Sequence, residues 1–345
     1  MRICAALWLF VAATAVAVNE SPTVVGNGWG LDHVIIAVSN SEIANRTYAG
    51  KLGFTPFVGN KFVSEGLDQA IIELPPAHYL ELLWPYREPA PDARPIATTV
   101  RKALETGGGI AAYNIDVSPV EQAVDAMRKL QLHVVVEPSR ATDTVDGKEV
   151  PAWRFARVDP QDLLLQPRGV PGGKAVGFIE YRVNVLNPAS FKKLQARAEK
   201  EVPDPRRLSG EIHANSARKI RAVWVAVPSV EEAVKQSARF GFVPRAKRKS
   251  ETIGEDGQEV QCGQGIVVFF EATHPGSSLA AYVKQHGLGP FGISIEVADI
   301  KTAQRVVEDG TQTRFKLERI GEERSFVVPE EIAGGLYIEF VQPIQ

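Results

Sequence analysis

A histidine and a glutamate stand in two otherwise apolar stretches near the N-terminus. His33 is the third residue of the run Leu31-Asp-His-Val-Ile-Ile-Ala-Val38, and Glu81 is the third residue of Tyr79-Leu-Glu-Leu-Leu83. A carboxylate in an apolar strand costs free energy unless it is paired or bound to a metal. Glu81 is therefore expected to be paired or bound to a metal. Two purely structural alternatives stay open: His33 bonded to Asp32 or to a neighbouring backbone group, and Glu81 paired with an arginine.

Both runs are typical of β-strands, because they are short and rich in β-branched and aliphatic residues. Strict alternation places Leu31 and His33 on one face of the first strand and Asp32 on the other. The same rule puts His78 on the opposite face of its strand from Glu81, and we expect His78 at the surface.

These strands belong to a unit that recurs four times in the sequence. The first unit, from Leu31 to about residue 84, has the order β-α-β-β-β, and a second follows a proline-rich linker and ends near residue 166. The third and fourth units begin near residues 220 and 289. The shift from Val38 to Val227 is 189 residues, and the shift from Val117 to Val297 is 180 residues. Two similar shifts indicate the duplication of a two-unit half.

The N-terminus predicts export. Residues 1–17 combine one arginine, an apolar run too short to span a bilayer, and an Ala15-Val-Ala17 cleavage pattern, which indicates a signal peptide. A secreted or periplasmic mature protein follows from this, with no membrane attachment after cleavage. We expect a flexible lead-in at 18–30, an N-terminal half at 31–167, a connecting segment at 168–219 and a C-terminal half at 220–345. After cleavage Cys262 is the one cysteine left, and we expect it in the core.

Charge excludes one class of partner. The net charge of −2 over 345 residues gives no electrostatic reason to expect nucleic acid. The basic run Arg245-Ala-Lys-Arg-Lys249 is short, and we interpret it as a solvated strand edge. Gly107-Gly-Gly109 lacks the Lys-Ser/Thr ending of a phosphate loop and precedes a strand, so no nucleotide cofactor is expected.

The four units, with Leu-Asp-His-Val on a first strand and Tyr-Leu-Glu-Leu-Leu on a fourth, resemble the vicinal oxygen chelate superfamily. That group includes glyoxalase I, bleomycin-resistance proteins and extradiol dioxygenases, and the first unit looks most like its glyoxalase-like branch. The resemblance implies an α+β fold of four βαβββ modules paired into two half-barrels. It also implies a divalent metal, such as Zn, Fe, Mn or Ni, held by histidines of first strands and glutamates of fourth strands.

Carried over by position, the implied metal ligands are His33, Glu81 and Glu339, with Glu81 also as the catalytic proton carrier. The other modules depart from the pattern: Ala112, Ala222 and Gly292 stand where a histidine is expected. The missing ligands count most against a dioxygenase, whose C-terminal half should carry the metal. A second copy in a homodimer would be one source of a missing ligand.

Two functions therefore stay open from the sequence. One is an exported protein that binds a small oxygen-rich ligand, through a divalent metal, with lyase or isomerase chemistry. The other is a metal-free protein that sequesters a small molecule, as bleomycin-resistance proteins do. The pair in the first module favours the first function, and the missing ligands favour the second.

Overall fold

The computed structural model describes residues 24–59, 61–74, 78–138, 142–145, 148–151, 153–158, 175–181 and 213–344. The predicted signal peptide, the fourth strand predicted near residues 162–166 and most of the predicted connecting segment lie outside these residues. Among the described residues, no helix has the length and apolar character needed to cross a membrane.

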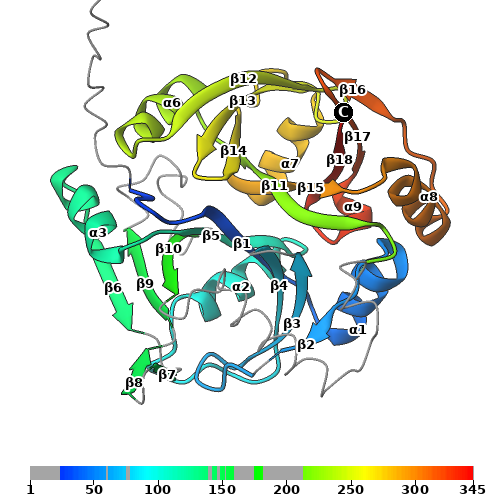
Figure 1. Cartoon of the computed structure of the whole chain (residues 1–345). Helices are drawn as coiled ribbons and strands as arrows, with labels where there is room; N and C mark the ends of the chain where they lie inside the picture. The colour runs from blue at the N-terminus through cyan, green and yellow to red at the C-terminus, as the bar shows by residue number, and fades with distance from the viewer. Residues whose placement is uncertain are drawn as a thin grey trace, which may run out of the picture.

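The described strands form two eight-stranded sheets, one in each half of the chain (Figure 1). The N-terminal sheet has the order β2-β3-β4-β1-β5-β10-β9-β6, and the C-terminal sheet has the order β12-β13-β14-β11-β15-β18-β17-β16. The N-terminal strands are β1 (Gly30–Ala37), β2 (Phe57–Val58), β3 (Leu67–Leu74), β4 (His78–Pro85), β5 (Gly109–Asp116), β6 (Val134–Pro138), β9 (Trp153–Val158) and β10 (Ala175–Tyr181). The C-terminal strands are β11 (Ala217–Ala226), β12 (Val243–Ser250), β13 (Glu255–Cys262), β14 (Gly265–Phe270), β15 (Gly289–Val297), β16 (Glu318–Ile320), β17 (Glu323–Val328) and β18 (Tyr337–Pro343). A separate hairpin pairs β7 (Thr142–Val145) with β8 (Lys148–Pro151).

Helical segments connect the strands within each module and between modules. They are α1 (Ser41–Ala44), the π-helical η1 (Asn45–Lys51), α2 (Ile96–Glu105), α3 (Val120–Lys129), α6 (Val230–Arg239), α7 (Ser278–His286), α8 (Ile300–Thr311) and α9 (Glu330–Ala333). In both sheets the first strands of two modules, β1 with β5 and β11 with β15, pair antiparallel at the centre. The predicted architecture of four βαβββ modules in two halves is confirmed.

One strand that the sequence assigns to the connecting segment belongs to the second module. The strand that pairs parallel with β5 is β10, which comes from the start of the segment interpreted as a connection. The N-terminal sheet therefore extends to Tyr181. The apolar stretch around Phe178 completes the second module because its side chain is fully buried against that sheet.

A helix packs on the concave face of each sheet, and neither helix was predicted from the sequence. Val100 and Ala103 of α2 pack against Ile35, Ala37 and Leu83 in the N-terminal sheet. In the C-terminal sheet, Leu279 and Tyr282 of α7 pack in the same way (Figure 1). Each cup is thus largely closed by the chain that links its two modules.

The two halves share one core on the other faces of their central strands. Val34 and Ile36 of β1 belong to the same buried cluster as Val223 and Val225 of β11. The backbones also meet closely: at Gly109, where φ is +93°, a Cβ atom would lie 2.0 Å from the carbonyl oxygen of Gly335. Only glycine fits this contact, which fixes the two halves against each other.

The same irregularity interrupts the central strand pair of both sheets. Asp32 and His33 of β1 together face Asn114 of β5, because the register shifts between Leu31 and Val34. In the C-terminal half a shift after Ile220 leaves Arg221 and Ala222 facing Ser294. Each is a β-bulge with two residues opposite one.

Candidate functional site

The two N-terminal residues singled out by the sequence lie together in the first cup. His33 Nε2 and Glu81 Oε2 are 3.9 Å apart, and the two residues are 4% and 8% exposed. They come from neighbouring parallel strands, in which His33 pairs with Tyr79 and Ile35 pairs with Glu81. The two side chains therefore lie side by side on β1 and β4.

The bulge adds Asp32 to this site, and this corrects the prediction from alternation. Leu31 packs in the shared core with Val34, whereas Ile35 and Ala37 face the cup. Because the bulge places two successive residues on one side of the strand, Asp32 joins His33 on the cup side. Its carboxylate makes a short hydrogen bond with His33 Nδ1.

Two tyrosines hold the Asp32 carboxylate in place. Tyr181 donates its hydroxyl to Asp32 Oδ2 at 2.9 Å, and the hydroxyls of Tyr79 and Tyr181 are 3.1 Å apart. Burial, followed by the charge of Asp32, raises the pKa of Tyr181 well above its usual value, so this tyrosine stays a donor. The Tyr79 ring stacks on the imidazole of His33, with centroids 4.3 Å apart.

These contacts select one tautomer of His33. A carboxylate can only accept, so Nδ1 carries a proton, and in the neutral form of the ring Nε2 is then the nitrogen with the lone pair. Asn114 Nδ2 lies 2.6 Å from Nε2 and donates to it. A carboxylate on one ring nitrogen orients metal-ligating histidines in proteins in the same way.

Glu81 is poised for proton transfer. Burial raises the pKa of its carboxyl, with a further small contribution from the charge of Asp32, while His33 and Arg94 act in the opposite direction. A raised pKa makes this carboxyl hold a proton more readily than an exposed glutamate does, and a carboxyl in such a setting is a candidate for general acid–base catalysis.

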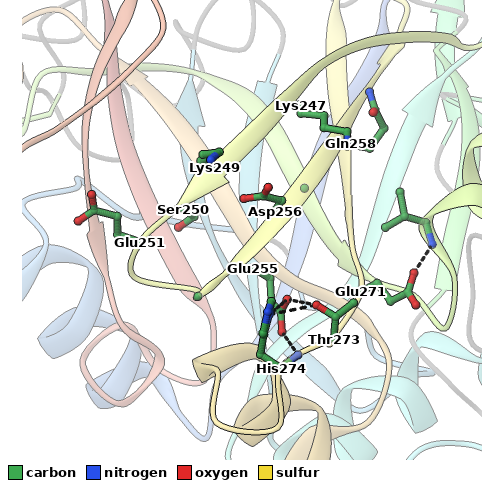
Figure 2. Close-up of a pocket in the computed structure, with 13 residues that line it drawn as sticks. Lys247, Lys249, Ser250, Glu251, Glu255, Asp256, Gln258, Glu271, Thr273 and His274 are labelled. Atoms are coloured by element: carbon green, nitrogen blue, oxygen red, sulfur yellow. Dashed lines mark hydrogen bonds and ion pairs between the residues drawn. The ribbon is translucent and has the colours of Figure 1, made fainter.

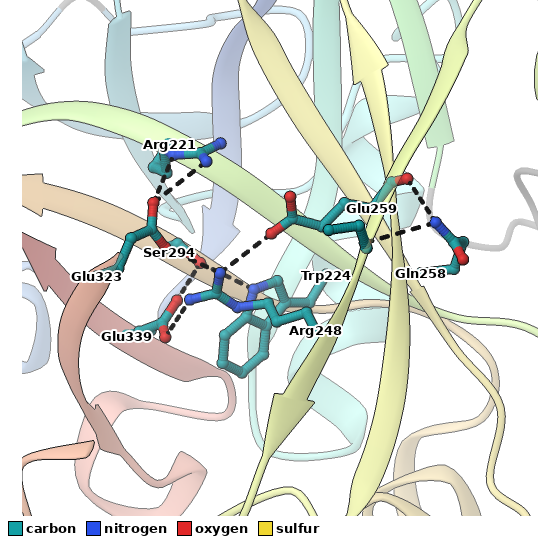
Figure 3. A network of polar contacts seen from close by, with 9 residues as sticks. Arg221, Trp224, Arg248, Gln258, Glu259, Ser294, Glu323 and Glu339 are labelled. Atoms are coloured by element: carbon teal, nitrogen blue, oxygen red, sulfur yellow. Dashed lines mark hydrogen bonds and ion pairs between the residues drawn. The ribbon is translucent and has the colours of Figure 1, made fainter. Parts of the chain in front are cut away.

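Glu339, the third ligand that the sequence predicts, lies in the other half. It is fully buried on β18 and bonds to Arg248 Nη2 and to the Ser294 hydroxyl, both at 2.5 Å (Figure 3). Arg248 Nη1 also reaches Glu259 and Glu323, each at 3.1 Å. The structure therefore places Glu339 in a network of ionic hydrogen bonds and does not bring it to His33 and Glu81.

Arg248 corrects the interpretation of the basic run as solvated. Arg245, Lys247 and Lys249 are exposed on one face of β12, but Arg248 is 3% exposed and points into the C-terminal cup. Its guanidinium is surrounded by three carboxylates from β13, β17 and β18 (Figure 3).

His78 also differs from its predicted surface position. It is 5% exposed, and its Nε2 accepts a hydrogen bond from Trp29 Nε1 at 3.0 Å. Burial lowers the pKa of His78 to about 4. Cys262 lies in the core as expected, and burial raises the pKa of its thiol.

Within the described ranges, no group of three or more His, Cys, Asp or Glu side chains could hold a metal ion. Asn114 and Tyr181 were not predicted as site residues, since a single asparagine or tyrosine in a strand carries no spacing signal. Their roles follow from the strand register, which the sequence does not show.

A separate hollow of about 530 Å³ lies on the C-terminal half, outside the cup (Figure 2). Lys247, Lys249 and Asp256 line it on the strands, and Thr273 and His274 form its rim. The rim is tied to Glu255, whose carboxylate accepts from Thr273 Oγ1 at 2.6 Å and from the backbone N–H of His274 at 2.8 Å.

Glu255→Gln is expected to destabilise this rim in a pH-dependent way. Burial would raise the pKa of Glu255, but hydrogen bonds from Thr273, His274 and Ser277 outweigh it and lower the pKa to about 2. A lowered folded-state pKa stabilises the fold above the unfolded value near 4.5, and this stabilisation is lost as the pH falls through about 2.

In urea titrations we expect Glu255→Gln to reduce the free energy of unfolding by about 3 kcal/mol at pH 7. The difference from wild type should shrink between pH 4.5 and pH 2. The exposed Glu231→Gln is the control and should change stability by less than about 0.5 kcal/mol. A loss that is equal at all pH values would contradict the role of the ionised carboxylate.

Comparisons with known proteins agree with the architecture. Residues 31–241, more than half of the chain, match the family model described as glyoxalase-like domain. No curated protein matches the sequence.

Several solved structures share the fold. A triple mutant of 4-hydroxymandelate synthase from Streptomyces coelicolor superposes with a TM-score of 0.59 and 14% identity, covering 92% of this chain and 94% of that one. A hypothetical protein from Staphylococcus aureus gives 0.54 and 11%, covering 90% and 98%. At these identities the likeness concerns the fold alone. The family model covers more than half of the chain, and the strand order and the His33–Glu81 pair agree with it. The chain therefore belongs to the glyoxalase-like domain family of the vicinal oxygen chelate superfamily.

Proposed function

We propose that the N-terminal cup binds a small oxygen-rich ligand at His33 and Glu81, through a divalent metal, for lyase or isomerase chemistry. The observation that carries this proposal is the orientation of His33: Asp32 holds Nδ1, so the Nε2 lone pair lies 3.9 Å from the Glu81 carboxylate. A buried carboxylate and a buried imidazole that face each other are well suited to share a cation.

The donor types and their spacing fit a metal. Imidazole nitrogen and carboxylate oxygen bind zinc-like ions at about 2.0 to 2.2 Å, so one ion can reach two such donors that are 3.9 Å apart. Two protein donors leave further coordination positions for oxygens of a ligand. A bound ion would polarise those oxygens and stabilise an enediolate or a similar anion.

The chain's own groups supply the remaining steps. Glu81 would take a proton from the ligand and return it at a neighbouring atom. Asp32 and Tyr181 would keep His33 in its tautomer. The packed helix α2 would limit water at the inner end of the cup.

Metal-free sequestration of a small molecule is the second candidate. It is favoured by the hydrogen bond from Asn114 Nδ2, which already satisfies His33 Nε2 without an ion. In that case the tyrosines and Phe155, which are only partly buried, would supply aromatic contacts to the ligand.

Metal content separates the two candidates. We expect the mature protein, residues 18–345, to hold one divalent ion per chain after purification without chelators. His33→Ala and Glu81→Ala should each lose it, because one remaining donor binds weakly. Elemental analysis of the dialysed proteins measures the stoichiometry, and circular dichroism checks the fold.

The matched controls are His274→Ala and Glu42→Ala, which remove an exposed imidazole and an exposed carboxylate and should leave the metal in place. Glu339→Gln tests the third predicted ligand; Arg248 already balances that carboxylate, so we expect it to keep the metal as well. Folded wild type without metal would refute metal binding and favour sequestration.

Export and assembly are part of the same proposal. Residues 1–17 would direct the chain out of the cytoplasm and then be removed. N-terminal sequencing of protein recovered outside the cytoplasm should begin near residue 18, and a start at Met1 would refute processing. A homodimer is proposed only as a source of further ligands, and the mass of the metal-loaded protein in solution tests it.

A further inference from the structure

We propose that Arg94 and Gln69 make the N-terminal cup selective for a small hydroxycarboxylic acid. Arg94 would bind the carboxylate of the ligand, and Gln69 Oε1 would accept a hydrogen bond from its hydroxyl. This inference rests on the proposed function, in which the cup takes a small oxygen-rich ligand at His33 and Glu81. It adds which oxygens the ligand carries and which side chains bind them.

Gln69 is a buried polar residue with an unsatisfied atom. It is 5% exposed, and in the described part of the chain its side-chain oxygen Oε1 has no hydrogen-bond partner. The backbone of Gly59 packs on the amide, since a Cβ at that position would lie 2.5 Å from Gln69 Cδ. A buried oxygen without a partner costs free energy. A ligand that donates a hydrogen bond to it would remove this cost.

Gln69 lies on the cup face of β3, beside the strand that carries Glu81. On the same face, Leu67 belongs to the buried cluster under α2, and Ile71 pairs with Glu81. Gln69 itself pairs with Leu83, two residues beyond Glu81 on β4. Diagonal neighbours on adjacent strands are about 7 to 8 Å apart, so one small ligand can contact both Gln69 and Glu81.

Arg94 supplies a cation at the edge of the same cup. Its Nε donates to the buried carboxylate of Glu65 at 2.6 Å, and its guanidinium lies over the ring of Phe62, 5.3 Å from the centroid. Phe62 packs against the buried cluster between α2 and the sheet. The Arg94 side chain is 31% exposed, and its two Nη atoms make no hydrogen bond with a described residue. Such free N–H groups match the oxygens of a carboxylate.

The charge of Arg94 acts on the site itself. Burial raises the pKa of Glu81, and the charges of His33 and then of Arg94 oppose this effect. Because a charge acts more weakly at longer distance, this places the guanidinium near Glu81. Arg94 also stands two residues before the start of α2, whose N-terminus has no side-chain cap. The positive end of a helix favours an anion nearby.

These groups together define the chemistry of the ligand. Arg94 offers donors and a positive charge, which a carboxylate satisfies. Gln69 Oε1 is an acceptor, which a hydroxyl satisfies because it can donate, whereas a ketone or a carboxylate can only accept. Glu65 already holds Nε of Arg94, so the guanidinium is positioned before the ligand binds.

Calorimetric titration with 2-hydroxyhexanoate and two matched probes tests this inference. The amide 2-hydroxyhexanamide has the same shape without the charge, and hexanoate lacks the hydroxyl. We expect wild type to bind 2-hydroxyhexanoate about tenfold more tightly than either probe, because the two contacts act on different groups. Arg94→Met should bind the acid no better than the amide. Arg94→Lys keeps a charge beside Glu65 and covers the case in which Arg94→Met does not fold. It should still weaken binding about threefold or more, since lysine lacks the planar pair of N–H groups.

Gln69→Met separates ligand recognition from a structural role. Removing a buried atom that has no partner should leave the free energy of unfolding unchanged or raise it. The affinity for 2-hydroxyhexanoate should nevertheless fall to that for hexanoate. The control is Arg87→Met, which removes an exposed arginine that bonds to the backbone oxygen of Val63. This variant should bind the acid as wild type does.

Two results would overturn the inference: wild type that binds 2-hydroxyhexanoate no better than the amide, or Gln69→Met that is less stable than wild type and binds the acid equally well. Loss of metal in His33→Ala and Glu81→Ala would in that case still support the proposed function. Selective binding of the acid by wild type that holds no metal would support the roles of Arg94 and Gln69 and refute the metal.

Discussion

Replacing Arg248 by Met is expected to destabilise the C-terminal half by about 3 to 5 kcal/mol, since removing one partner of a buried ion pair leaves uncompensated charge. Arg248 is 3% exposed and is the cation that bonds directly to Glu259 and Glu339 in the described structure (Figure 3). Met keeps much of the side-chain length but cannot donate. The free energy of unfolding at pH 7, from urea titration followed by tryptophan fluorescence, measures the loss.

Two further variants make this expectation specific. Arg314→Met removes an arginine whose side chain is 91% exposed and which pairs with Glu308, and it should cost less than about 1 kcal/mol. Adding Glu339→Gln to Arg248→Met should recover part of the stability, because one unpaired charge is removed. A loss below 1 kcal/mol for Arg248→Met, or a double variant that is less stable than the single variant, would contradict the stabilising role of the buried network.

Asp32→Asn is expected to weaken metal binding in the N-terminal cup by about 10- to 100-fold, the usual cost of losing a carboxylate behind a ligating histidine. An asparagine can still accept the proton of His33 Nδ1, but it has no charge to stabilise an imidazole that binds a cation. It can also offer an N–H, which would favour the other tautomer and turn the lone pair away from Glu81. Competition titration with Zn²⁺ gives the affinity.

The controls for Asp32→Asn separate charge from packing. Tyr181→Phe removes only the hydroxyl that bonds to Asp32 at 2.9 Å and should cost less than tenfold. Asp256→Asn, an exposed aspartate of β13, should leave the affinity unchanged. Wild-type affinity in folded Asp32→Asn would show that His33 does not depend on this carboxylate.

The sequence predicts the architecture well because the evidence for it is periodic and repeated. Strands, helices and the two-half duplication follow from alternation and from near-equal shifts, and the His33–Glu81 pair follows from the resemblance to the vicinal oxygen chelate superfamily. The helices α2 and α7 were not predicted, although they are about as long as α3 and α6, because each lies between two modules and outside the repeated unit. Proline residues before α2 also suggest irregular chain.

The details of the site depend on register, which a single sequence does not reveal. Alternation assigns Asp32 to the face opposite His33, and one bulge reverses this. Likewise, nothing in the sequence distinguishes Arg248 from its exposed basic neighbours. It is buried because it faces the cup, where Glu259, Glu323 and Glu339 from three other strands receive it. Such contacts join residues far apart in the chain and leave no local pattern.

Because the two bulges match, the side chains at the bulge can differ between the two cups while the backbone geometry stays the same. In one half the bulge displays Asp32 and His33 opposite Asn114, and in the other it displays Arg221 and Ala222 opposite Ser294. The backbone thus presents two neighbouring side chains at one point whatever their chemistry. A transplant of the acidic and imidazole pair into the C-terminal half would need no new strand geometry. It would need only the release of the carboxylates that Arg248 now holds.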